Sequence, residues 1–217
     1  MKSDRREFLL AAGVYGAAVA ASVAVPLRAI AADDEKMDKE ADAEISAPED
    51  LMREHGVLDR ILLVYEEGLR RMRSKENVPP DAFHRPAALV RSFVEDYHEQ
   101  LEETFIFPRF EKGNELVELV GVLRRQHAAG RRLTDIVLRN AVKDAFTSEE
   151  SRQAVTGACR SFIRMYRPHA AREDTVLFPA LYGLLGGKTV KELGEQFEEQ
   201  EHRRFGEGGF HKAVEEV

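Results

Sequence analysis

Apolar residues recur at steps of three and four along most of the chain after residue 46, the spacing of the buried face of an α-helix. The first stripe follows the helix-start signals of Ser46 and Pro48 and contains Leu51, His55, Leu58, Leu62 and Tyr65. Two further stripes contain Val90, Val94, His98, Leu101 and Phe105, and then Leu116, Val120, Leu123, His127, Thr134 and Val137. The pattern also predicts helices over about 148–183 and 188–205.

These helical segments are separated by short breaks, and no alternating strand pattern accompanies them. The breaks fall at residues 77–81, 112–114 and 140–147 and at Gly186-Gly187. Long helices joined by short connections favour packing as antiparallel neighbours. The sequence therefore predicts an all-α fold, an antiparallel four-helix bundle with an additional short C-terminal helix, over residues 47–217.

The first 31 residues have the composition of a targeting segment. Arg5-Arg6 precedes an uncharged stretch from Phe8 to Val25, and a small-residue Ala29-Ile30-Ala31 site follows. This arrangement resembles a twin-arginine (Tat) signal peptide, and residues 32–46 are expected to form an acidic flexible linker. We expect export by the Tat machinery to the periplasm of a bacterium. An uncleaved N-terminal membrane anchor is the alternative, because 18 uncharged residues approach the length that spans a bilayer.

The composition of the chain excludes some kinds of partner and some kinds of metal site. The chain has 32 Lys and Arg against 39 Asp and Glu, a net charge of −7, which argues against nucleic acid as a partner. Cys159 is the only cysteine, so neither an internal disulfide nor a cysteine-based metal motif can form. A metal in this protein must be held by nitrogen and oxygen ligands.

An internal repeat is the most informative feature of the sequence. At an offset of 71 residues, the segment from Tyr97 to Pro108 aligns with the segment from Pro168 to Pro179. Both contain His-x-x-x-Glu, then an acid, then Phe-Pro. At an offset of 72, Arg53-Glu54-His55 aligns with Arg125-Gln126-His127. Each half of the domain thus has a histidine on its first helix and His-x-x-x-Glu on its second.

The spacing of these residues suits a metal site between helices. Residues four apart lie on the same helix face, so His98 with Glu102, and His169 with Glu173, each present a nitrogen and a carboxylate to one point. Core histidines that are hydrogen-bonded to these glutamates are the alternative. Converging carboxylates would nevertheless leave buried charge that a pair of divalent cations would compensate. Imidazole and carboxylate without thiolate suit iron or manganese, and zinc is possible.

The order His, His-x-x-x-Glu, His, His-x-x-x-Glu over about residues 48–205 resembles the hemerythrin-like (HHE cation-binding) family. The resemblance implies a four-helix bundle that holds two non-haem Fe ions, bridged by oxo or hydroxo, and binds dioxygen or a related small molecule. Carried over residue by residue, it implies the terminal ligands His55, His98, His127 and His169. The bridging carboxylates would be Glu102 and Glu173.

The sequence departs from the oxygen carriers of this family in two places. They have a second histidine four residues after the one on the third helix, where this chain has Arg131. They also use an aspartate five residues after the last-helix histidine, which makes Asp174 an alternative to Glu173. His202 is the candidate for the missing fifth histidine. Two octahedral irons have about twelve ligand positions. If His202 is a ligand, about one of these positions stays open for an outside molecule, and if it is not, about two stay open.

Three functions follow from this interpretation. The first is reversible binding of dioxygen or another small diatomic ligand, for storage, delivery or sensing outside the cytoplasm. The alternative is a di-iron oxidoreductase that acts on peroxide or nitric oxide and draws on an unidentified electron donor. The third is a helical bundle without redox metal that acts through protein contacts. Tyr65, Tyr97 and Tyr166 are candidates for hydrogen-bond donors beside the site.

Overall fold

The computed structural model describes residues 46–206 and residue 215, and within these residues it contains helices and no strand. The all-α prediction is therefore confirmed for the described part of the chain. The predicted signal peptide and the linker up to residue 45 lie outside it. Among the described helices, none combines the length and the apolar character needed to cross a lipid bilayer.

The first half of the domain consists of two long helical stretches. The first is α2 (Ala47–Arg73). The second stretch changes helix type along its length and consists of α3 (Asp81–Leu89), the π-helix η2 (Val90–His98), α4 (Glu99–Leu101), the π-helix η3 (Glu102–Ile106) and α5 (Phe107–Gly113).

The second half repeats this plan, and a fifth helix follows it. The elements are α6 (Val117–Asn140), the 3₁₀ turn η4 (Ala145–Thr147), α7 (Glu149–Arg172), the π-helix η5 (Glu173–Leu177) and α8 (Phe178–Leu185). The last helix is α9 (Gly187–Phe205). Each predicted break lies at or next to a junction between helices, although α2 already ends at Arg73 and α5 continues to Gly113.

Local sequence explains where these helices begin and end. Ser46 and Glu49 form a capping box at the start of α2, and the Ser148 side chain accepts a hydrogen bond from the Ser151 N–H at the start of α7. Gly186 has φ of 75°, a left-handed conformation that costs little without a Cβ, and it ends α8.

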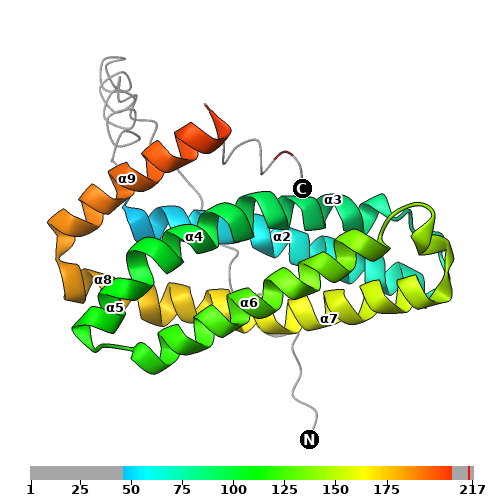
Figure 1. Ribbon diagram of the computed structural model, residues 1–217, viewed down its shortest axis with the longest axis horizontal. Helices are drawn as coiled ribbons and strands as arrows, with labels where there is room; N and C mark the ends of the chain where they lie inside the picture. Colours follow the sequence, from blue (N-terminus) through cyan, green and yellow to red (C-terminus); the bar gives the residue numbers. More distant parts are fainter. Residues whose placement is uncertain (1–45, 207–214, 216–217) are drawn as a thin grey trace, which may run out of the picture. The chain divides into compact units, whose positions relative to one another are not determined.

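The helices bury the apolar stripes against one another. Figure 1 shows α2, α6 and α7 running alongside the stretch that α3 to α5 form, with α9 inclined across one end. Contacts join α6 to α7, α2 to α7, and α3 to both α2 and α6, whereas α9 packs on α2 and α8. The predicted stripe residues of α2 all lie in the resulting core.

The π-helical segments η3 and η5 were not predicted, and both lie at the His-x-x-x-Glu motifs. A π-helix widens the helical turn and is found often at functional sites. Here η3 begins at Glu102 and η5 at Glu173, each directly after an α-helical segment. In these segments Glu102 and Glu173 are buried, whereas the acids that follow them, Glu103 and Asp174, are partly exposed.

Two glycines of α2 give a matched test of this packing. A Cβ at Gly68 would lie 2.6 Å from the Phe83 ring, whereas a Cβ at Gly56 would meet nothing within 4 Å. We expect Gly68→Ala to destabilise the domain by about 1–3 kcal/mol through overpacking. Gly56→Ala should stabilise it by about 0.5–1 kcal/mol, because alanine is the better helix former. Urea unfolding would measure both, and a stabilising Gly68→Ala would contradict the packing of α2 on α3.

Candidate metal centre

Six buried side chains converge in the middle of the domain, between the two halves. They are His55, His98, Glu102, His127, His169 and Glu173, none more than 4 % exposed. Two compact groups can be distinguished, His55 with His98 and Glu102, and His127 with His169 and Glu173. The structure therefore brings together six of the seven residues that the sequence predicted as ligands.

Each glutamate lies close to histidines of both halves. Glu102 Oε2 is 3.8 Å from His98 Nε2 on its own helical stretch and 3.4 Å from His127 Nε2 on α6. Glu173 Oε1 is 3.2 Å from His169 Nε2, and its Oε2 is 3.4 Å from His55 Nε2 on α2. Such positions suit carboxylates that bridge two metal ions.

In each of the four cluster histidines, the ring nitrogen that points away from the cluster, Nδ1, is hydrogen-bonded to a side-chain oxygen. His55 Nδ1 lies 2.8 Å from Asp174, and His98 Nδ1 lies 2.6 Å from Glu54. The corresponding partners are Glu103 at 2.8 Å for His127 and the Gln126 amide oxygen at 3.0 Å for His169. A proton on Nδ1 that is donated to these oxygens leaves Nε2 as a lone pair directed inward, the usual arrangement of metal-binding histidines.

These four partners are related by the internal repeat. Glu103 aligns with Asp174 and Glu54 aligns with Gln126, so each half supplies the same two supports. The Phe-Pro motif repeats in the same way, because Phe107 stacks on His127 at 5.5 Å and Phe178 stacks on His55 at 5.9 Å between ring centroids. The sequence analysis missed these supports, although the aligned motifs contained them.

The interior of the cluster holds acceptors without matching donors. All four carboxylate oxygens of Glu102 and Glu173 are buried and lack a hydrogen-bond partner. His127 Nε2 and His169 Nε2 lie 3.2 Å apart, and with both Nδ1 atoms protonated these are two facing lone pairs. Buried charge of this kind is costly unless a cation compensates it.

A metal ion fits this donor set. Two nitrogens bound at about 2.1 Å to one metal at a right angle lie about 3 Å apart, close to the separation of His127 Nε2 and His169 Nε2. Four imidazoles and two carboxylates without sulfur suit iron, manganese or zinc. Two groups joined by two glutamates suit a pair of ions rather than one.

The electrostatics of the metal-free cluster agree with this interpretation. Burial and the neighbouring charge of Glu173 raise the pKa of Glu102 well above its ordinary value. Burial lowers the pKa of His98 strongly, and the other histidines of the cluster lower it further. Burial likewise lowers the pKa of His169, to about 4. Both histidines are therefore neutral, the form that binds metal.

His55 differs from the other histidines. Burial lowers its pKa, but the carboxylates of Asp174 and Glu173 outweigh burial and raise it to about 9. In the metal-free protein a proton on His55 therefore offsets part of the negative charge of the cluster. Metal binding at this residue must displace that proton.

Comparison with known proteins identifies the family. The model of the hemerythrin HHE cation-binding domain matches residues 46–181, and a second, overlapping match covers residues 120–207. The chain belongs to this family. Two overlapping matches accord with the internal repeat, because the second begins where the second half of the domain begins.

Proteins similar to this hemerythrin-like chain occur in mycobacteria. Rv1995 of Mycobacterium tuberculosis and Mb2018 of Mycobacterium bovis are each 46% identical to it over 178 residues, which cover 82% of this chain and 70% of the relative. Both are described as uncharacterized proteins. No solved structure matches the chain.

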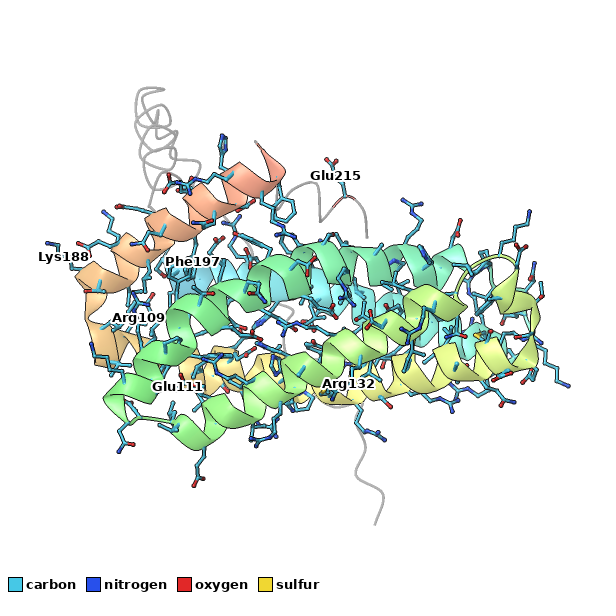
Figure 2. All side chains as sticks on the ribbon, in the orientation of Figure 1. Arg109, Glu111, Arg132, Lys188, Phe197 and Glu215 are labelled. Carbon is cyan, nitrogen blue, oxygen red and sulfur yellow. The ribbon has the colours of Figure 1, made fainter. Side chains whose placement is uncertain are left out.

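The structure does not bring His202 into the hemerythrin-like cluster. The buried face of α9 contains Val190, Leu193, Gly194 and Phe197, and Glu201 follows at the next helical step. His202 lies one residue further, turned by about 100° to the exposed side. Figure 2 shows Phe197 on the side of α9 that faces the domain. In the described part of the chain, no group of metal-capable side chains includes His202.

Glu173, rather than Asp174, faces the cluster. The Glu173 side chain is fully buried, whereas that of Asp174 is 34% exposed and holds His55 Nδ1 from outside. Asp174 therefore occupies a supporting position in this arrangement. The wide π-helical turn of η5 allows the two neighbouring acids to contact different atoms of the same imidazole ring.

Arg131 supports the cluster instead of joining it. Its Nη2 lies 2.9 Å from Glu103, the partner of His127, and 2.7 Å from the buried Glu99. The Tyr166 hydroxyl donates to the other oxygen of Glu99 at 2.6 Å. Gly130 leaves room for this hydroxyl, since a Cβ there would overlap it. Of the other tyrosines proposed as donors, Tyr97 donates to the Phe197 carbonyl, whereas Tyr65 packs on Phe83 and Phe162.

Replacement of Glu102 tests whether the cluster needs a cation. We expect Glu102→Gln to stabilise the metal-free protein at neutral pH by about 1–3 kcal/mol, because it removes a buried carboxylate without a donor. Since the folded-state pKa of Glu102 is raised, wild-type stability falls as pH rises above the unfolded pKa, and the advantage of the variant should shrink toward acid pH. The same variant should lose bound metal.

Urea unfolding in chelator across pH, together with metal analysis, measures both effects. Glu67→Gln is the control, because Glu67 is on the surface and pairs with Arg70 and Arg71. It should keep its metal. A metal-free Glu102→Gln protein that is less stable than wild type at pH 7 would indicate that the carboxylate is satisfied within the protein.

Proposed function

We propose that this chain is a dinuclear non-haem iron protein that binds dioxygen or a related small diatomic ligand reversibly, for storage, delivery or sensing. The observation that carries the proposal is the set of four inward imidazole nitrogens around two buried, donor-free carboxylates. We further infer the finer architecture of the family, an antiparallel four-helix bundle formed by the four long helical stretches with α9 added. When bound, the iron pair supplies the site at which a small oxygen ligand is taken up.

The residues of the chain have separate tasks in this proposal. His55, His98, His127 and His169 would hold the ions, and Glu102 and Glu173, each close to histidines of both halves, would contribute carboxylate ligands. Asp174, Glu54, Glu103 and Gln126 keep each Nδ1 protonated and each ring in place. Phe107 and Phe178 are fully buried and stack on His127 and His55, and apolar rings in these positions would keep water from the cluster and slow loss of electrons from the reduced centre.

One observation favours a second function, that of an oxidoreductase acting on peroxide or nitric oxide. The cluster contains four histidines and not five, so it supplies fewer protein ligands and leaves more positions for an incoming molecule. Three of the four histidines are also supported by carboxylates. Carboxylate partners make imidazole more basic and stabilise the oxidised metal, which suits repeated redox turnover.

Iron content in matched histidine variants tests the ligand set. We expect about two irons per chain in protein purified without chelators. His98→Ala should lose iron, because it removes a donor from the cluster, whereas His202→Ala should keep the wild-type content, because that side chain is exposed. Elemental analysis measures both. Loss of iron from His202→Ala would return His202 to the ligand set, and wild-type protein without iron would overturn the di-iron proposal.

Optical spectra distinguish the two functions. Reversible binding predicts a charge-transfer absorption that develops when the reduced protein meets air and disappears under vacuum. The oxidoreductase predicts a single oxidation under air and multiple turnovers of peroxide or nitric oxide when an electron donor is supplied. A protein that does neither, with two irons bound, would contradict both functions.

Export is part of the proposal and rests on the sequence of residues 1–31. We propose that the Tat machinery carries the folded protein to the periplasm, with an uncleaved membrane anchor as the alternative. The route would suit a protein that acquires its metal before export. Fractionation of cells that express Arg5→Lys/Arg6→Lys protein measures this, and unchanged export of that variant would exclude the twin-arginine route.

A further inference from the structure

Glu54 has an oxygen that the iron cluster does not use. Its Oε2 accepts the hydrogen bond from His98 Nδ1, whereas its Oε1 is buried without a hydrogen-bond partner. The residue is 2 % exposed, so water does not solvate this oxygen freely. The Tyr97 hydroxyl also interacts with this carboxylate, but Oε1 itself has no donor within hydrogen-bond distance. A buried carboxylate oxygen of this kind is costly unless a proton or a cation compensates it.

Two further carboxylates lie around Glu54. Ligand oxygens of Asp50, one turn earlier on α2, and of Glu201 on α9 lie with that of Glu54 within 4.8 Å of one another. Burial and the charge of Glu201 raise the pKa of Asp50 to about 6, in spite of the nearby Arg53. Glu198 adds a further negative charge near Asp50. Acidic groups therefore outnumber basic ones in this part of the α2–α9 contact.

The internal repeat indicates that this acidity is not needed to hold the histidine. The residue aligned with Glu54 is Gln126, whose neutral amide oxygen supports His169 Nδ1 in the same way. The residue aligned with Asp50 is Val122. The first half of the domain thus has two acidic residues at positions where the second half has an amide and an apolar side chain.

We propose that Asp50, Glu54 and Glu201 form a second cation site, outside the iron cluster, for a divalent ion that prefers oxygen ligands. Carboxylates without imidazole or thiolate suit Ca²⁺, Mg²⁺ or Mn²⁺. Oxygens that share a Ca²⁺ ion at about 2.3–2.6 Å can lie no more than about 5 Å apart, which these three satisfy. The ion would join α9 to α2 and would share Glu54 with His98 of the inner cluster.

Titration of the iron-loaded protein with Mn²⁺ tests the site. The six-line EPR signal of free Mn²⁺ reports how much ion remains unbound, and Ca²⁺ is then added as a competitor. We expect a single Mn²⁺ site per chain from which Ca²⁺ displaces the ion. Asp50→Asn and Glu201→Gln should each weaken binding by at least about tenfold, because each removes a charged ligand.

Glu199→Gln is the matched control. Glu199 is on the same helix but is 60% exposed and pairs with Arg203, so its variant should bind Mn²⁺ like wild type. Equal binding by wild type, Asp50→Asn and Glu201→Gln would overturn the proposal, as would Mn²⁺ that Ca²⁺ cannot displace. The proposal is independent of the iron function, since neither variant alters a residue of the inner cluster, and unchanged iron content in both distinguishes the two.

Discussion

The central constraint on this structure is the burial of two carboxylates among four imidazole rings. The carboxylate oxygens of Glu102 and Glu173 are buried without a hydrogen-bond partner, and the rings of Phe107 and Phe178 stack on His127 and His55 beside them. Cations at the centre of this arrangement would compensate the buried charge. The helices, their π-helical turns and the supporting acids can all be understood as the means of holding these donors at one point.

The supports matter as much as the donors. A neutral imidazole can carry its proton on either nitrogen, and only the tautomer with Nδ1–H leaves Nε2 free for a metal. An oxygen acceptor at every Nδ1 holds a proton there, and His55 reaches the metal-binding form once metal displaces its second proton. Arg131 in turn stabilises the supports, because it pairs with both Glu103 and Glu99 and offsets the repulsion between these two carboxylates. The residues around the cluster thus fix the orientation of the imidazole rings inside it.

Helical spacing made much of this predictable from the sequence. His98 with Glu102 and His169 with Glu173 face one point in any helix, and the repeat indicated which histidines accompany them. The π-helical turns were not predicted: regular α-helical spacing placed Phe105 on the buried face, whereas the structure buries Ile106 and Phe107 and leaves Phe105 partly exposed. The face of His202 was also not predictable, since it depends on how α9 packs on α2, where Phe197 is buried and Glu201 lies near Asp50 and Glu54.

Comparison of the two halves of the internal repeat shows which residues have the same role in both halves and which have a role in one half alone. Where the two halves agree, as at Glu102 and Glu173, Phe107 and Phe178, or Glu103 and Asp174, each residue performs the same task on the opposite side of the cluster. Where the two halves have different residues at aligned positions, those residues have different roles. Gln126 supports its histidine without charge, whereas Glu54 brings a charge and a spare oxygen to the side that α9 covers. The two ends of the cluster therefore have unlike electrostatic surroundings, although their donors are equivalent. Metal ions bound at the two ends would therefore meet different electrostatic surroundings.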